Sequence, residues 1–145
     1  MPTLPPSRTR RIAYWVATLI VALETGVGGI MDLMRTEHVR MVVSHLGYPV
    51  YLLTILGLWK IPGAVMLLLP RLPRLREWAY AGIFFEMTGA AGSHAVFHDA
   101  GYMAITLTFA LLTLASRMLL PPDRSAGAVG RSAVVTSGHS RSSSR

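Results

Sequence analysis

The chain of 145 residues is 52% hydrophobic and only 14% charged. Soluble domains carry about a quarter charged residues, so a water-soluble protein of this length would lack polar surface. A net charge of +7 would suggest nucleic-acid binding in a soluble protein, but the arginines lie between apolar runs instead of along one face, which excludes that partner. The lack of cysteine excludes disulfides, iron–sulfur clusters and covalently attached c-type haem.

The hydrophobic residues gather into four runs of roughly 20 residues. A helix of about 20 residues, rising about 1.5 Å per residue, matches the roughly 30 Å hydrocarbon core of a bilayer. Parts of these runs, such as 65–69 and 109–114, are apolar nearly all round the helix, whereas helices of soluble bundles carry a polar face. We therefore predict an all-α fold, an integral membrane four-helix bundle in the lipid bilayer. It forms one domain, 12–120, with spans at residues 12–34, 50–69, 78–97 and 102–120.

The arginines are distributed unevenly around the predicted spans. Eleven of them precede the first span, separate the second from the third, or lie at the end of the fourth or beyond it, whereas two separate the first from the second and none the third from the fourth. Because basic residues resist translocation, this bias predicts that both termini are cytoplasmic. The flanking segments are predicted to be a polar lead-in, 1–11, and a disordered cytoplasmic tail, 121–145. The eleven arginines are Arg8, Arg10, Arg11, Arg71, Arg74, Arg76, Arg117, Arg124, Arg131, Arg141 and Arg145.

The connection between the first two spans, 35–46, has a helical pattern of its own. Its apolar residues recur at helical spacing, namely Val39, Val42, Val43 and Leu46. This pattern predicts an amphipathic helix on the outer surface, either a lid over an outward-facing cavity or a connector resting on lipid. His38 and His45 share one face of it, and we interpret them as solvated polar surface rather than as metal ligands.

Three ionisable residues lie inside the predicted spans, where such a group costs at least about 2.5 kcal/mol near the bilayer centre. Counted from the predicted cytoplasmic ends, Glu24, Lys60 and Glu86 lie about 18, 15 and 13 Å deep and so form one buried polar layer. Lys60 is expected between the two carboxylates, and because these leave one negative charge over, we expect a proton to be shared. One reading of the layer is a site that handles protons or binds a ligand among the neighbouring glycines. The other is a structural staple that fixes the register of the helices.

The outer ends of the spans gather further imidazoles and carboxylates. His94 lies on the same helix face as Glu86 but nearer the outer surface. With Asp32 at the end of the first span and His98 and Asp99 in the last turn, it forms a predicted outer-side polar cluster of groups that relay protons or hold metals. No metal site is predicted, because a turn is expected to separate His94 from His98. No intrinsic haem is predicted either, because only one histidine lies convincingly within a span.

Four motifs together carry a family resemblance: HLGYP at 45–49, LGLWKIPGA at 56–64, EWAYAG at 77–82 and GAAGSH at 89–94. They resemble the DoxX-like family of small bacterial four-helix membrane proteins, over about residues 12–115. The resemblance implies a four-span bundle in the bacterial inner (plasma) membrane. Through a distant relation to the DoxX and DoxD subunits of thiosulfate:quinone oxidoreductase, it also implies a link to quinone-coupled redox chemistry.

Three functions stay open at this point. The leading hypothesis is a membrane subunit that binds a quinone or lipid within the bundle and passes electrons or protons to a redox partner protein, with Glu24, Lys60 and Glu86 handling protons. Under this hypothesis the protein is an accessory subunit rather than a stand-alone enzyme, and no catalytic residue is assigned. No intrinsic cofactor is predicted, and quinone is the candidate ligand. The second hypothesis is a non-enzymatic scaffold or accessory protein whose charged layer assembles the bundle. The third is a small proton-coupled carrier, which four spans would support only as a homo-oligomer.

Overall fold

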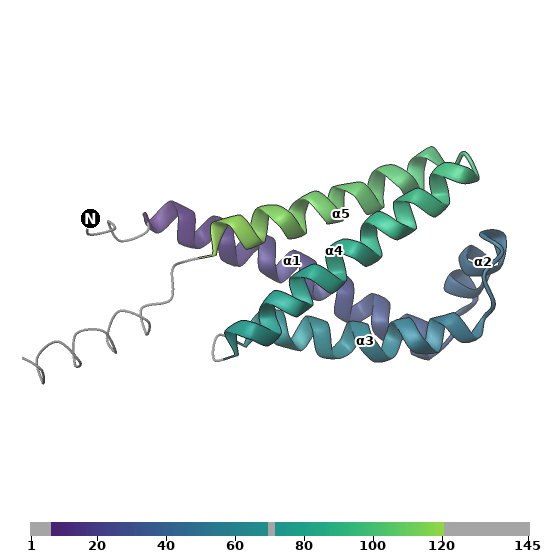
Figure 1. The fold of residues 1–145 in the computed structure, drawn as a ribbon, viewed down its shortest axis with the longest axis horizontal. Helices are drawn as coiled ribbons and strands as arrows, with labels where there is room; N and C mark the ends of the chain where they lie inside the picture. The colour runs from purple at the N-terminus through teal and green to yellow at the C-terminus, as the bar shows by residue number, and fades with distance from the viewer. Residues whose placement is uncertain (1–6, 70–71, 121–145) are drawn as a thin grey trace, which may run out of the picture.

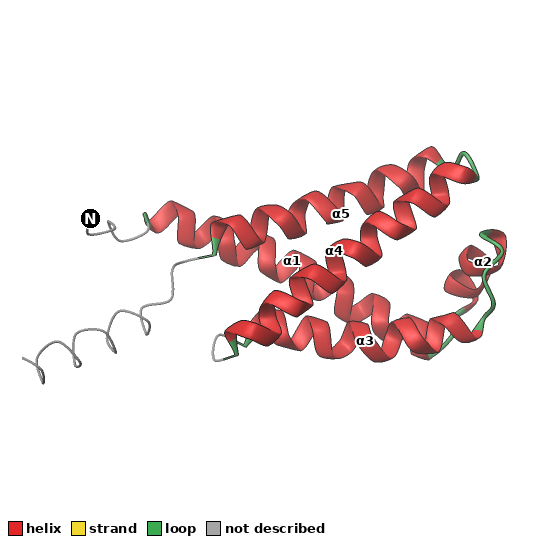
Figure 2. Ribbon diagram, viewed as in Figure 1, coloured by secondary structure: helices red, strands yellow, loops and turns green. Residues whose placement is uncertain are grey.

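The computed structural model describes residues 7–69 and 72–120, and the regular structure of these residues is entirely helical. The described residues form four long helices, α1 (Arg8–Leu33), α3 (Tyr51–Leu68), α4 (Pro73–Val96) and α5 (Ala100–Leu119), and one short helix, α2 (Glu37–His45) (Figure 1, Figure 2). The expected all-α fold is therefore confirmed for this part of the chain. The predicted tail, 121–145, and the start of the predicted lead-in, 1–6, lie outside the described residues.

The four long helices cover the four apolar runs, but two of them begin a full helical turn or more before the runs do. α1 begins at Arg8, within the predicted lead-in, because Ser7 caps it by accepting a hydrogen bond of 3.3 Å from the backbone N–H of Arg10. α4 begins at Pro73, where the fixed φ and missing N–H of proline suit the first turn of a helix. Both helices therefore extend past their apolar runs into arginine-rich sequence.

Successive long helices run antiparallel, as expected for short connections (Figure 1). α1 packs along α3 and α4 packs along α5, and these two hairpins separate from each other towards the end of the molecule at which α2 lies. We call this end, with α2 and the turn 97–99, the α2 end, and the opposite end, where α1 begins and α5 stops, the terminal end. The core lies between the hairpins and consists of Val21, Ala22, Leu67, Tyr80, Ile83, Met87 and Ala110.

Many large apolar side chains lie on the outside of the helices, with Trp59, Trp78 and Phe85 among the most exposed. Three of the described helices, α1, α3 and α5, are long and apolar enough to cross a membrane. α4 has 24 residues, but Glu86, His94 and several glycines lower its mean hydropathy. The outer surface along the helices therefore suits contact with lipid rather than with water.

Two glycines bring α1 and α3 very close together. A Cβ atom on Gly29 would lie 2.7 Å from the Cβ of Lys60, and a Cβ atom on Gly57 would lie 2.7 Å from the carbonyl oxygen of Gly29. Because no side chain fits at either position, this contact fixes how far α3 is shifted along α1. It also sets Lys60 beside Gly29, within one helical turn of Asp32.

α2 has the amphipathic character predicted from its sequence. The residues expected on its apolar face are buried or half-buried, namely Val39, Val42, Val43 and Leu46. On the opposite face Glu37 and Arg40 are exposed and form an ion pair of 3.7 Å. The pattern of period 3.6 therefore identified both the helix and its orientation.

Candidate functional site

Lys60 is held between two carboxylates inside the helix bundle. Its Nζ lies 2.9 Å from Oδ2 of Asp32 on α1 and 2.8 Å from Oε1 of Glu86 on α4. The side chains of Lys60, Asp32 and Glu86 are 12%, 6% and 21% exposed. We call these three residues the ion cluster. One ammonium group thus joins three helices, and its contact with Glu86 links the two hairpins.

The ion cluster differs from the predicted polar layer in one member. From the sequence we expected Glu24 to lie beside Lys60, and we assigned Asp32 to the outer-side polar cluster. In the structure, Asp32 is the residue of α1 that pairs with Lys60. Glu24 accepts a hydrogen bond of 3.4 Å from Thr25 and lies close by, since a Cβ atom on Gly28 would be 3.6 Å from Lys60 Nζ and 3.7 Å from Glu24 Oε1. The depths counted from the ends of the apolar runs did not identify this pairing. The position of α3 along α1 is set by the glycine contact between these two helices and not by where the apolar runs end.

The charges in this layer do not balance. Asp32, Glu86 and the nearby Glu24 bring three carboxyl groups to one ammonium group, so charge balance requires protons or further cations there. The contact of Asp32 with Lys60 is close but poorly directed, because Asp32 Oδ2 receives no hydrogen bond of good geometry from the described residues. The attraction therefore rests on charge, which is strong where water is excluded.

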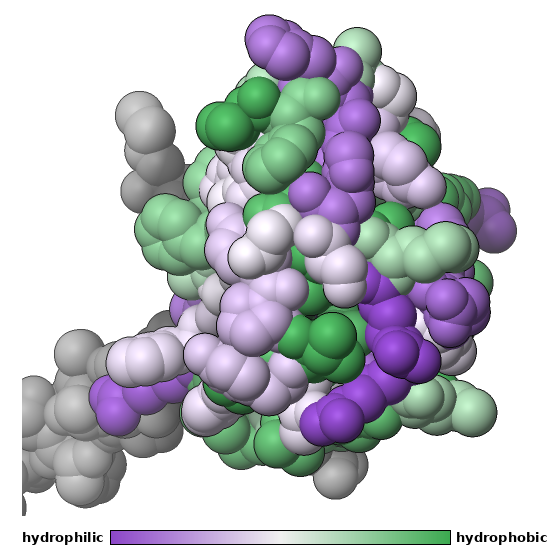
Figure 3. Space-filling model, turned by 90° about the vertical axis from the view of Figure 1, so that its right-hand side faces the viewer, coloured by the Kyte–Doolittle hydropathy of each residue, from purple (hydrophilic) through white to green (hydrophobic). Residues whose placement is uncertain are grey.

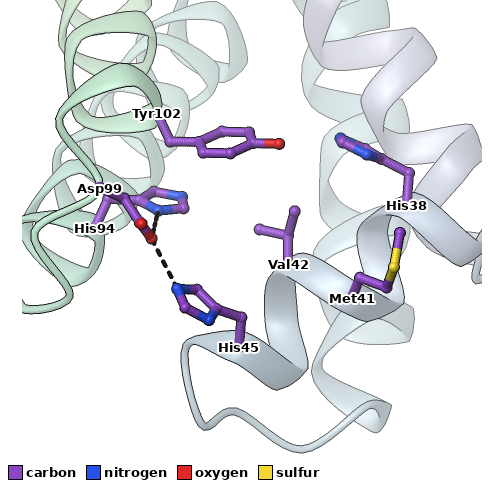
Figure 4. Close-up of a pocket in the computed structure, with 7 residues that line it drawn as sticks. All are labelled: His38, Met41, Val42, His45, His94, Asp99 and Tyr102. Carbon is purple, nitrogen blue, oxygen red and sulfur yellow. Dashed lines mark hydrogen bonds and ion pairs between the residues drawn. The ribbon is translucent and has the colours of Figure 1, made fainter.

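A pocket of about 240 Å³ opens at the α2 end, between α2 and the turn that joins α4 to α5 (Figure 4). It is lined by His38, Met41, Val42, His45, His94, Asp99 and Tyr102. The first four of these residues come from α2, so α2 forms one wall of the pocket. Figure 3 looks onto this end of the molecule and shows hydrophilic residues running across it between hydrophobic flanks. Of the two readings of α2, the lid is the one that this geometry supports.

Asp99 lies between two imidazoles in this pocket. Its Oδ2 is 3.0 Å from Nε2 of His45 and 3.3 Å from Nδ1 of His94. His94 is buried, and its ring stacks on that of Tyr102 with the ring centroids 5.0 Å apart and the planes inclined by 14°. Because Nδ1 of His94 is engaged by Asp99, its Nε2 is the nitrogen left for a ligand. In Figure 4 this nitrogen points into the space that His38 borders from the other side.

Polar side chains hold the end of α2 against the hairpin of α4 and α5. In addition to the bond between His45 and Asp99, the hydroxyl group of Tyr48 lies 2.9 Å from Oγ of Ser93. We call these two contacts the α2 clasp. Both contacts are hydrogen bonds between side chains, each worth a modest net free energy, so the clasp can open at a modest cost.

The predicted outer-side polar cluster is only partly assembled. His94 and Asp99 are brought together as expected, but Asp32 belongs to the ion cluster. His98 has a φ of 58° at the end of α4 and does not line the pocket. The sequence missed Tyr102, and it noted that His38 and His45 share a face without connecting them to His94. Within residues 7–69 and 72–120 no three His, Asp or Glu side chains are grouped to hold a metal ion.

Long apolar helices, hydrophobic side chains facing outwards and charges paired in the interior define the chain as a helical membrane protein. The chain belongs to the DoxX-like family, whose model matches residues 16–116. This match confirms the resemblance carried by the four sequence motifs. No curated protein and no solved structure matches the chain.

Proposed function

We propose that the protein is a multi-pass membrane subunit of a redox system and that it binds the ring of a quinone in the pocket at the α2 end. The observation that carries the proposal is the pocket itself, which combines imidazoles, a carboxylate and an aromatic ring at one end of a lipid-exposed bundle. In this proposal α4 crosses the bacterial inner membrane together with α1, α3 and α5. Both termini are cytoplasmic, and α2 lies on the outer surface.

The size and lining of the pocket fit a single substituted ring. Its volume of about 240 Å³ is below the roughly 300–1,000 Å³ of pockets that enclose drug-sized ligands, so an isoprenoid tail would remain outside in the lipid. Nε2 of His94 and the hydroxyl group of Tyr102 are hydrogen-bonding groups of the kind that quinone carbonyl oxygens accept from. Met41 and Val42 supply apolar contacts for the ring.

The pocket residues are also suited to holding a proton. When bound, a quinone takes up two electrons and two protons on conversion to a quinol. His94 can carry a proton on Nε2, and the contact of Nδ1 with Asp99 fixes the orientation of its ring. Asp99 also contacts His45 at the exposed rim, so protons have a path from solvent to His94. The electrons would come from a redox partner protein.

His98, four residues after His94, provides a matched control for a test of the proposed quinone site. In detergent, the affinity of the wild-type protein for a short-chain ubiquinone is measured by equilibrium dialysis and compared with that of His94→Gln and His98→Gln. We expect His94→Gln to bind about tenfold more weakly, since it loses the hydrogen bond from Nε2 to a quinone carbonyl oxygen. His98→Gln should bind as the wild type does, because His98 lies outside the pocket. Equal affinities for all three proteins would rule out this pocket as the quinone site.

A non-enzymatic accessory role is the second candidate function, and the ion cluster favours it. Lys60 pairs with carboxylates from two other helices, which is the arrangement expected of a structural staple. On this alternative, Lys60→Met lowers the stability of the protein or its yield in complex with a partner. The wild-type protein then binds no quinone, which separates the alternative from the first proposal.

A further inference from the structure

A second buried polar network lies at the terminal end, opposite the pocket, and joins α1, α4 and α5. Oγ of Ser116 lies 2.7 Å from Oγ1 of Thr18 and 2.9 Å from the hydroxyl oxygen of Tyr80. Thr18 also donates a hydrogen bond of 2.8 Å to the backbone carbonyl oxygen of Tyr14. All four residues are buried, so a hydrogen-bonded polar layer lies beneath the first turns of α4.

Arg76 lies one helical turn before Tyr80, on the same face of α4. It is only 8% exposed, and its Nε has no hydrogen-bond partner among the described residues. The neighbouring carboxylate, Glu77, pairs with Arg117 instead. Arg76 is therefore a buried cation that forms no ion pair within the part of the chain that the structure describes. Removing such a charge from water without a partner is costly, so this arrangement calls for an anion.

The backbone at the start of α4 adds positive charge at the same place. Among the described residues no side chain caps the helix, and its first turn contains no acidic residue. The N–H groups of Arg74 and Leu75, which follow Pro73, therefore have no acceptor within the helix, and the aligned peptide dipoles contribute about half a positive charge there. Helical side chains lean towards the N-terminus of their helix, which is the direction from Arg76 in which these N–H groups lie.

We propose that Arg76 and the first turn of α4 bind a phosphate group. The planar guanidinium group pairs with phosphate oxygens through two parallel hydrogen bonds, and uncapped N–H groups at a helix start bind anions. The network of Tyr80 and Ser116 forms a polar floor for the site. The phosphate belongs either to the headgroup of an anionic lipid or to free inorganic phosphate. The site is independent of the proposed quinone pocket, which lies at the other end of the helices.

The test uses the full-length protein in dodecyl maltoside, a detergent without phosphate, and measures its melting temperature with and without added dioleoyl phosphatidylglycerol. The lipid should raise the melting temperature of the wild-type protein, because a ligand that binds only the folded state stabilises it by mass action.

Arg8→Gln, at an exposed arginine of the same end, should respond as the wild type does. Arg76→Met should lose the response while melting no lower without lipid, because it removes an unpaired buried charge. Arg76→Lys, which keeps the charge but not the two-pronged geometry, should need about tenfold more lipid.

Inorganic phosphate in place of the lipid forms the second arm of the experiment. A response to phosphatidylglycerol alone identifies a lipid headgroup as the occupant, and a response to inorganic phosphate identifies the free anion; either supports the site. The proposal is overturned if neither probe raises the melting temperature of the wild-type protein. It is equally overturned if Arg76→Lys and Arg76→Met respond as the wild type does.

Discussion

Lys60 of α3 and Glu86 of α4 form an ion pair of 2.8 Å that links the two helical hairpins. Lys60 is the single lysine of the chain, and the same ammonium group also lies 2.9 Å from Asp32. Lys60→Met would leave the two carboxylates facing each other in the interior. We predict that it lowers the free energy of unfolding by about 3–5 kcal/mol, the range measured when one partner of a buried ion pair is removed. Unfolding by sodium dodecyl sulfate from mixed micelles measures this change.

The same assay distinguishes the carboxylate that pairs with Lys60 from the one that lies beside it. Asp32→Asn removes an ion pair and should destabilise the protein clearly, whereas Glu24→Gln removes none and should cost less than about 1 kcal/mol. If the two substitutions were equally costly, the assignment of Asp32 rather than Glu24 to the ion cluster would be wrong. An unchanged Lys60→Met protein would likewise contradict the role of the cluster as a link between hairpins.

The contact between α1 and α3 predicts opposite effects for alanine at different glycines. Gly57→Ala would force a methyl group to within 2.7 Å of the backbone oxygen of Gly29, which cannot move aside cheaply, so we predict a loss of about 1–3 kcal/mol. Gly63 and Gly89 lie in helices, and beyond the local helix backbone no atom of the described residues lies within 4 Å of an added Cβ there. There alanine should be neutral or stabilise the protein by up to about 1 kcal/mol through its better helix propensity. The same unfolding assay would contradict this packing if Gly57→Ala and Gly63→Ala behaved alike.

The helices of this fold could be predicted from the sequence because each depends on a pattern within one segment. The length of the apolar runs gave the four long helices, and the period of the valines in 39–43 gave α2. The shift of one helix along another depends on two segments at once. It is set by Gly29 against Gly57, and neither glycine differs in the sequence from those with open space around them. For that reason Asp32 was assigned to the wrong cluster.

The candidate pocket shows the same limit. His94 and Asp99 were grouped correctly because only five positions separate them across a tight turn. His45 approaches the same carboxylate from α2, which is far away in the sequence, and no periodicity within one segment reports such a meeting. His98 was included because it is a histidine close to His94, but its backbone φ of 58° belongs to the turn that ends α4. Backbone conformation, rather than residue type, decides which of the two histidines lines the pocket.

The α2 clasp predicts a local change in mobility when Asp99 is replaced. Asp99→Ala removes the acceptor shared by His45 and His94, each at hydrogen-bond distance. A hydrogen bond contributes about 1–1.5 kcal/mol net, so opening of α2 should become about tenfold more frequent. Hydrogen–deuterium exchange of residues 37–45, followed by mass spectrometry, measures this opening. His98→Ala is the control and should leave exchange in α2 as it is in the wild type, and similar exchange in all three proteins would show that the clasp does not hold α2.

The proposed topology can be tested with introduced cysteines, because the natural sequence has none. Ser44 lies exposed on α2, and Ser7 lies exposed at the terminal end, just before α1. If the arginine-rich terminal end is cytoplasmic, a membrane-impermeant maleimide added to intact bacterial cells should label Ser44→Cys and leave Ser7→Cys unlabelled. Permeabilised cells should label both, which controls for the accessibility of each thiol. Labelling of Ser7→Cys alone in intact cells would invert the topology. Labelling of both in intact cells would place Ser7 and Ser44 on the same side of the membrane, and α1, the long helix between them, would then not span the bilayer.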